Sequence, residues 1–374
     1  MIHLFTTNQH THRPNALAHK PASWGKRLWA SICITMLSTL VSLPANAQWK
    51  SYLAYSEPTE IERASGNMIY VLASEGLYSY DTSDQSLQTY DKINALSDCG
   101  IAHIAWCQKA KRLVIVYSNY NIDLLEANGN VVNMADYMNK TMTTDKTVND
   151  IYVDGAYAYL STGFGIVKIN VANGNISDTY QLGFKVNYSY IKDGYLYAAS
   201  MANGMYRAPL TANLLDPNQW TRSGNYVWRK KTMDEELLNI VKTLAPGGPK
   251  TNYCGFLKLY GNKLFSCNGT FDVKPGSIQV LENNTWTIYQ DDIEAITGRR
   301  YQDILAIDVD PKNSNHVMAA GRNGLYEFSN GRFVAYYNNE NSPIQSYNNS
   351  DKEYQMVTGL KYDNDGNLWM LNSQ

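Results

Sequence analysis

Short apolar runs alternate with polar turns along most of the chain. In residues 66–81, a Gly-Asn turn is followed by Met68–Ala73, a polar turn that ends in Gly76, and a second run that ends at Asp81. Runs of this length that are rich in β-branched and aromatic residues, and are bounded by Gly, Asn and Asp, are typical of β-strands joined by tight turns. The pattern therefore predicts an antiparallel strand pair.

The same arrangement recurs in residues 111–125, 154–169, 193–207, 261–281, 315–328 and 365–370. Apolar residues at the equivalent place in the repeats are separated by 39 to 47 positions, apart from one gap of 73; they are Leu77, Ile122, Ile166, Met205, Ile278 and Leu325. A period of about 40–50 residues made of short strands is typical of β-propeller blades.

Each repeat also contains a strand before and a strand after the predicted pair. Residues 101–106 and 148–153 are examples of the preceding strand, and Trp286–Tyr289 is an example of the following one. Four strands per repeat are what a propeller blade requires. We therefore predict an all-β fold, a seven-bladed β-propeller.

The two ends of the sequence suggest how the ring closes. Trp49–Tyr52 is similar to the outer strand Trp286–Tyr289, and the last repeat, from Val357 onward, lacks its outer strands. A strand from the N-terminus that completes the last blade would leave no exposed sheet edge. We expect this closure, and we expect the sequence to be C-terminally truncated.

The first 47 residues are typical of a signal peptide. Lys26 and Arg27 precede an apolar stretch, Leu28–Leu43, and Ala45–Ala47 has the small-x-small pattern of a signal peptidase site. The apolar stretch is shorter than the roughly 20 residues of a membrane span, although an uncleaved anchor is the alternative. We predict an exported protein, with residues 48–374 forming the propeller.

Composition restricts the function classes. The chain has 32 Lys and Arg and 34 Asp and Glu, a net charge of −2, which excludes a strongly basic nucleic-acid binder. Removing residues 1–47 changes the charge to −6 and leaves only His103 and His316. Clustered metal ligands and the Gly-x-Ser-x-Gly, Walker and Rossmann motifs are absent from the sequence. We therefore predict no enzyme activity, metal or cofactor.

The gap of 73 marks an insertion at about residues 210–251. Its candidate binding residues are Trp220, Trp228, Arg229, Lys230 and Lys231, since aromatic and basic side chains together suit an anionic partner such as phosphate or a carboxylated glycan. A solvated loop is the alternative. Leu237, Ile240 and Val241 follow at helical spacing and predict one short helix.

Two cysteines flank a predicted turn at residues 260–263. If this turn joins a hairpin, Cys254 and Cys267 lie in near-diagonal positions on one face. Export permits a disulfide between them. Buried thiols are the alternative.

Several motifs resemble known propeller families. Residues 323–328, 330–333 and 365–369 look like the two-component-regulator propeller repeat. Residues 49–52, 76–81, 96–98 and, most distinctively, 113–125 resemble the PorZ family of surface components of the type IX secretion system. The resemblance covers the predicted mature chain and matches the N-terminal part of that family.

The resemblance implies a non-catalytic scaffold in a cell-surface attachment complex. Its partners would be a sortase and other attachment-complex proteins at the outer membrane, and it would help to deliver anionic lipopolysaccharide to the sortase for cargo anchoring. The alternative is the periplasmic glycan-sensing propeller of a hybrid two-component regulator. A kinase and a membrane span encoded further downstream would favour the sensor, and a β-sandwich would favour the scaffold.

Overall fold

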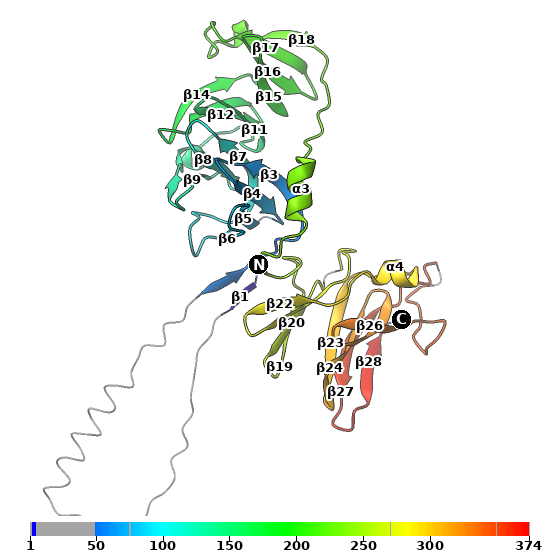
Figure 1. Ribbon diagram of the computed structural model, residues 1–374. Helices are drawn as coiled ribbons and strands as arrows, with labels where there is room; N and C mark the ends of the chain where they lie inside the picture. The colour runs from blue at the N-terminus through cyan, green and yellow to red at the C-terminus, as the bar shows by residue number, and fades with distance from the viewer. Residues whose placement is uncertain (1, 5–48, 75, 270, 349, 374) are drawn as a thin grey trace, which may run out of the picture. The chain divides into compact units, whose positions relative to one another are not determined.

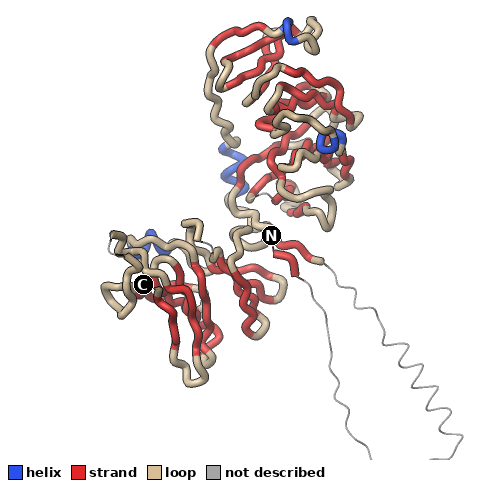
Figure 2. Tube along the Cα trace, turned by 180° about the vertical axis from the view of Figure 1, so that it is seen from behind, coloured by secondary structure: helices blue, strands red, loops and turns tan. Residues whose placement is uncertain are grey.

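The computed structural model describes residues 2–4, 49–74, 76–269, 271–348 and 350–373. Strands account for most of the regular structure, and the helices are short (Figure 2). The predicted signal peptide lies outside the described residues, except for residues 2–4. In the part of the chain that the structure describes, no helix is long and apolar enough to cross a membrane.

Seven antiparallel sheets follow one another along residues 58–372 (Figure 1). The first sheet contains β3 (Pro58–Arg63), β4 (Met68–Ala73), β5 (Gly76–Asp81) and β6 (Leu87–Tyr90). The second contains β7 (Ile101–Cys107), β8 (Arg112–Tyr117), β9 (Ile122–Glu126) and β10 (Val131–Asn133). The third contains β11 (Val148–Asp154), β12 (Tyr157–Thr162), β13 (Gly165–Asn170) and β14 (Asn175–Gln181).

The remaining sheets continue this order. The fourth sheet contains β15 (Tyr188–Lys192), β16 (Tyr195–Ser200), β17 (Gly204–Pro209) and β18 (Thr221–Gly224), and the fifth contains β19 (Phe256–Tyr260), β20 (Lys263–Cys267), β21 (Ile278–Glu282) and β22 (Thr285–Ile288). The sixth contains β23 (Ile304–Asp310), β24 (Asn313–Gly321), β25 (Gly324–Ser329) and β26 (Arg332–Tyr337). The last is the pair β27 (Val357–Tyr362) and β28 (Leu368–Asn372). The predicted all-β propeller with seven blade-like sheets is confirmed.

The glycine that starts the third strand of a sheet has a steric reason. Gly165 and Gly324 have φ values of 154° and 115°. A Cβ atom would lie 2.0 Å from the carbonyl oxygen of Tyr180 at Gly165, and 2.6 Å from that of Tyr337 at Gly324. Only glycine allows the third strand to begin this close to the fourth, which explains why glycine recurs there in the repeats.

The apolar core lies between neighbouring sheets. The equivalent residues Leu77, Ile122 and Ile166 are each fully buried. One apolar cluster joins the first and second sheets through Leu72 and Ile115, and others join later sheets. The first strands of successive sheets also contact each other, β3 with β7, β7 with β11 and β11 with β15. Successive blades therefore stack side by side, as the repeat pattern predicts.

The predicted closure of the last blade by the N-terminal strand is not found. In the described residues, β2 (Lys50–Tyr52) pairs with β1 (Ile2–Leu4), and β27 and β28 form a sheet of their own. The physical reason is that a fourth strand needs a third strand as its partner, and the sequence supplies only β27 and β28 for this blade. Tyr52 instead lies against Trp286 of β22, with ring centroids 5.5 Å apart.

The long insertion contains both regular and irregular structure. β18 and the 3₁₀ turn η1 (Pro217–Gln219) fall inside residues 210–251, and β18 completes the fourth sheet. The predicted helix is present as α3 (Glu235–Val241), which contacts β3 (Figure 1). Leu237 and Val241 are buried in one cluster with Val71. The other α-helices within the described residues are α2 (Asp136–Asn139) and α4 (Ile293–Thr297).

Candidate functional site

An irregular segment, residues 225–233, connects β18 to α3; we call it the strap. In the described part of the chain, the strap makes no backbone-to-backbone hydrogen bond. Its carbonyl group at Val227 accepts a hydrogen bond of 2.6 Å from the Tyr188 hydroxyl. The strap is therefore held mainly by side chains.

Four residues beneath the strap occupy one structural position in four successive blades. Each residue lies on the first strand of its sheet. Its partner on the second strand pairs, in turn, with the equivalent apolar residue of the third strand, which is Leu77, Ile122, Ile166 or Met205 in the four sheets. The four first-strand residues are Glu60, His103, Asp150 and Tyr188. We call these four residues the inner row. A β-bulge directly precedes the first three of them, and bulges commonly re-aim a neighbouring side chain.

The strap places two cations on the inner row. Arg229 Nη2 lies 2.7 Å from Asp150 Oδ2, and its guanidinium lies 4.4 Å from the centroid of the Tyr188 ring. Lys231 Nζ lies 2.6 Å from Glu60 Oε1, the same oxygen that is 2.8 Å from His103 Nδ1. The strap thus contacts the first, third and fourth members of the row directly, and the second through Glu60.

The carboxylates of the inner row are far less exposed than the cations that meet them. The side chains of Glu60 and Asp150 are each 7% exposed, whereas those of Arg229 and Lys231 are 43% and 46% exposed. Buried carboxylates require partners because an uncompensated charge is costly to bury. The strap supplies those partners while its own side chains remain in contact with solvent.

The two carboxylates respond differently to their surroundings. Burial opposes ionisation of Glu60, but the hydrogen bond to His103, the charge of Lys231 and the backbone amide of Ile104 together lower its pKa below the ordinary value. Burial raises the pKa of Asp150, and the charges of Arg229 and Lys231 offset this effect only in part. Glu60 is therefore the firmly ionised member of the pair.

The five residues predicted to bind an anionic partner do not lie together. Trp220 is buried between the third and fourth sheets, where its ring lies 6.2 Å from that of Tyr180 and its Nε1 donates to the Leu214 carbonyl. Arg229 and Lys231 face the inner row, and Trp228 is 68% exposed. Lys230, between them, is exposed. The basic run thus alternates between residues that face inward and residues that face solvent.

The sequence interpretation missed the inner row itself. Glu60, His103 and Asp150 each precede an isoleucine and follow one another at intervals of 43 and 47 residues, close to the repeat period. A search for polar residues that recur with the blades could have found them. The basic run is visible as consecutive residues, whereas its acidic partners are distant in sequence, so the pattern did not connect the two.

The two cysteines considered for a disulfide are free thiols in this structure. Phe256 pairs with Cys267 across β19 and β20, so Cys254 lies before the paired region. The Cys267 thiol is buried and donates a hydrogen bond of 2.9 Å to the Ile304 carbonyl. Cys254 instead lies 3.8 Å from the Nε2 atom of Gln279. The two side chains therefore make different contacts in this structure, and a disulfide between them in the exported protein stays a prediction.

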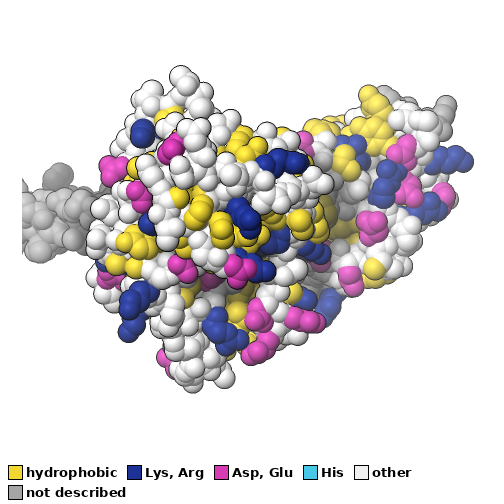
Figure 3. All heavy atoms as spheres, turned by 90° about the horizontal axis from the view of Figure 1, so that it is seen from above, with side chains coloured by type: hydrophobic (Ala, Val, Ile, Leu, Met, Phe, Trp, Pro, Cys, Tyr) yellow, Lys and Arg dark blue, Asp and Glu magenta, His cyan; other side chains and the backbone are white. Residues whose placement is uncertain are grey.

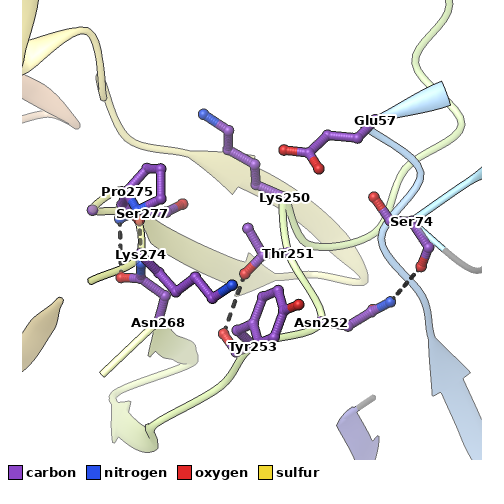
Figure 4. Close-up of a pocket in the computed structure, with 11 residues that line it drawn as sticks. Glu57, Ser74, Lys250, Thr251, Asn252, Tyr253, Asn268, Lys274, Pro275 and Ser277 are labelled. Carbon is purple, nitrogen blue, oxygen red and sulfur yellow. Dashed lines mark hydrogen bonds between the residues drawn. The ribbon is translucent and has the colours of Figure 1, made fainter. Parts of the chain in front are cut away.

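A pocket of about 670 Å³ lies beside the fifth sheet (Figure 4). Two lysines line it, and Lys274 Nζ stands 4.8 Å from the centroid of the Tyr253 ring while Lys250 pairs with Asp291. Ser277 also lines it, and its buried hydroxyl has no hydrogen-bond partner among the described residues. This pocket combines positive charge, an aromatic face and polar groups.

Both remaining histidines pair with carboxylates. His103 contacts Glu60, and His316 lies 3.1 Å from Asp310 and 2.9 Å from Glu327. Burial works against protonation of His316, but its hydrogen bonds with these two acids raise its pKa above the ordinary value. In the described ranges, no group of three or more His, Cys, Asp or Glu side chains is arranged to hold a metal.

Comparisons with known proteins identify the type of propeller. Residues 69–221 match the family model for the PorZ N-terminal β-propeller domain of type IX secretion. No curated protein matches the sequence. The chain resembles a solved structure of PorZ, described as an essential bacterial surface component of the type IX secretion system of Porphyromonas gingivalis, with a TM-score of 0.73 and 20% identity. The match covers 87% of this chain and 57% of that one.

Other propellers are less similar. The extracellular domain of a putative hybrid two-component system from B. thetaiotaomicron matches with a TM-score of 0.36 and 14% identity, over 84% of this chain and 38% of that one. A TM-score this low does not support a sensor function for this chain. The predicted resemblance is therefore confirmed: residues 69–221 match the PorZ N-terminal β-propeller family of type IX secretion, and the chain shares the fold of the solved PorZ propeller.

Proposed function

We propose that the protein is a non-catalytic scaffold of the type IX cell-surface attachment complex, where it helps to deliver anionic lipopolysaccharide to the sortase that anchors cargo. The observation that carries this proposal is the match of residues 69–221 to the PorZ propeller family. Its expected partners are the sortase and the other attachment-complex proteins. The chain spans 57% of the solved PorZ protein that it matches.

The arrangement of charges suggests where an anionic saccharide would bind. Basic and acidic side chains are interspersed on the face shown in Figure 3, without a broad area of one sign. Arg229 and Lys231 of the predicted basic run already face carboxylates. The pocket with Lys250, Lys274 and Tyr253 is the better candidate. Lys250 pairs with Asp291, but Lys274 forms no ion pair among the described residues and lies over the Tyr253 ring, and a cation beside an aromatic ring suits an acidic sugar.

Binding of purified full-length protein to anionic lipopolysaccharide tests this proposal. We expect saturable binding that weakens at least about tenfold in a Lys250→Ala/Lys274→Ala variant, because each lost charge-assisted contact is worth about 1 kcal/mol or more. Lys230→Ala, which removes an exposed lysine outside the pocket, is the matched control. Equal binding of all three proteins would contradict the pocket assignment, and failure to recover the sortase with tagged protein from outer-membrane extracts would contradict the scaffold role.

A further inference from the structure

We propose that the inner row is a binding site for an extended basic segment of a partner protein, and that the strap occupies this site as a built-in competitor. Such a segment would carry two cationic side chains two positions apart, as the strap does with Arg229 and Lys231. This inference is independent of the saccharide pocket.

The way in which the strap is seated defines the ligand chemistry. Arg229 forms an ion pair with Asp150 and stacks on the Tyr188 ring, and Lys231 forms an ion pair with Glu60. Alternate residues of an extended chain point to opposite sides, so the two inward cations are separated by the outward Lys230. The contacts use side-chain charge and one backbone carbonyl, which any segment with the same spacing of cations can provide.

The repeat, and not the strap, supplies all four members of the site. Glu60, His103, Asp150 and Tyr188 come from four separate sheets and share one register position. In the fifth and sixth sheets, the residues at this position are apolar: Phe256 and Ala306. The ionisable members of this position (Glu60, His103, Asp150 and Tyr188) are thus confined to the first four blades.

Several features make the strap exchangeable. The strap has no backbone pairing with the sheets in the described part of the chain. Both of its inward cations are more than two-fifths exposed, and ion pairs that solvent can reach are weak. With the strap in place, the carboxylates of Glu60 and Asp150 are each 7% exposed, and loss of their cations would leave two poorly solvated charges that favour a replacement cation. Release of the strap would therefore favour capture of another basic segment.

A peptide with the sequence of residues 225–233 is the probe. We expect fluorescence polarisation to show at least about tenfold tighter binding of the labelled peptide to full-length protein carrying Arg229→Gln/Lys231→Gln than to wild type, because the intramolecular competitor is weakened. Lys230→Gln removes a neighbouring positive charge that faces solvent, and this control should behave as wild type.

Further variants test whether the inner row is the receptor. Adding Glu60→Gln and Asp150→Asn to the double variant should abolish the gain, as should replacing the peptide residues that correspond to Arg229 and Lys231 with Gln. Unchanged peptide affinity in a double variant with native circular dichroism would overturn the proposal. If that variant does not fold, hydrogen exchange of the wild-type strap decides instead: excess peptide should accelerate exchange of amides 226–231, and an unchanged rate would refute competition.

Discussion

Glu60 remains ionised in a place where burial alone would favour its neutral form. His103, Lys231 and the Ile104 amide surround its carboxylate, and their combined effect lowers its pKa. A carboxyl group with a lowered pKa in the folded state stabilises that state above its unfolded pKa, and this contribution disappears as the pH falls through the folded pKa.

Replacing Glu60 by Gln should therefore have a pH-dependent effect. We expect a loss of about 2 kcal/mol in the free energy of unfolding at pH 7, which is typical of a lost hydrogen-bonded charge. The difference from wild type should shrink below the ordinary glutamate pKa of 4.5, as measured by denaturant titration at several pH values. Glu236→Gln, at a 75% exposed side chain, is the control and should show little effect at any pH. A constant difference across the whole pH range would contradict this assignment.

The cysteines should differ in reactivity according to their burial. Burial raises the pKa of the Cys267 thiol far above its ordinary value, whereas Cys99 is exposed. We expect an alkylating reagent to modify Cys99 in the native protein and to leave Cys267 unmodified, as mass spectrometry of peptides would show. After denaturation without a reductant, both Cys254 and Cys267 should react. Failure of both to react would indicate a disulfide in the exported protein.

Side-chain environments were the least predictable feature at this scale. The composition of Trp228–Lys231 indicated a basic binding run, but its partners Glu60 and Asp150 are 171 and 79 residues away from Lys231 and Arg229. Trp220 belongs to the core because β18 pairs with β17. Sequence pattern identifies residue types that suit a ligand, whereas register decides which of them face solvent.

At the scale of elements, α3 depends on tertiary packing. A helix of seven residues is too short to be stable in isolation. Asp234 accepts a hydrogen bond from the Leu237 amide at its N-terminus, and Leu237 and Val241 pack into the apolar cluster of the first sheet. The helix therefore anchors the end of the strap to the first blade.

Leu237→Ala should test this anchor. Leu237 is 2% exposed, and truncating a fully buried leucine costs about 2–5 kcal/mol in the free energy of unfolding. Asn239→Ala, on the exposed side of the same helix, should cost less than about 0.5 kcal/mol. Equal midpoints of thermal unfolding for the two variants would show that α3 does not pack as described.

Strands were predictable because their spacing repeats. Turn residues recur at the same points in the blades, and in four sheets a glycine starts the third strand; Gly165 shows the steric reason. The irregular strap follows no period. The sequence therefore predicted one undivided insertion at residues 210–251. In the structure, Thr221–Gly224 within that range is a strand of the fourth blade.

At the scale of the molecule, the repeat count was enough to predict a propeller of seven blades. Closure was not predictable in the same way, because pairing of the N-terminal strand depends on which free edge it can reach. Its expected partner strand is absent from the sequence, and in the structure Tyr52 contacts Trp286 of the fifth sheet. Repeats determine the blades locally, whereas closure depends on contacts between the two ends.

The fate of cargo in a strain that lacks the gene tests the central claim most directly. The scaffold account predicts that type IX cargo is still made but is no longer attached to the cell surface, and that the full-length gene restores attachment when it is reintroduced. Cell fractionation and immunoblotting of a surface-anchored cargo protein provide the measurement. Normal attachment of cargo in the deletion strain would contradict the account.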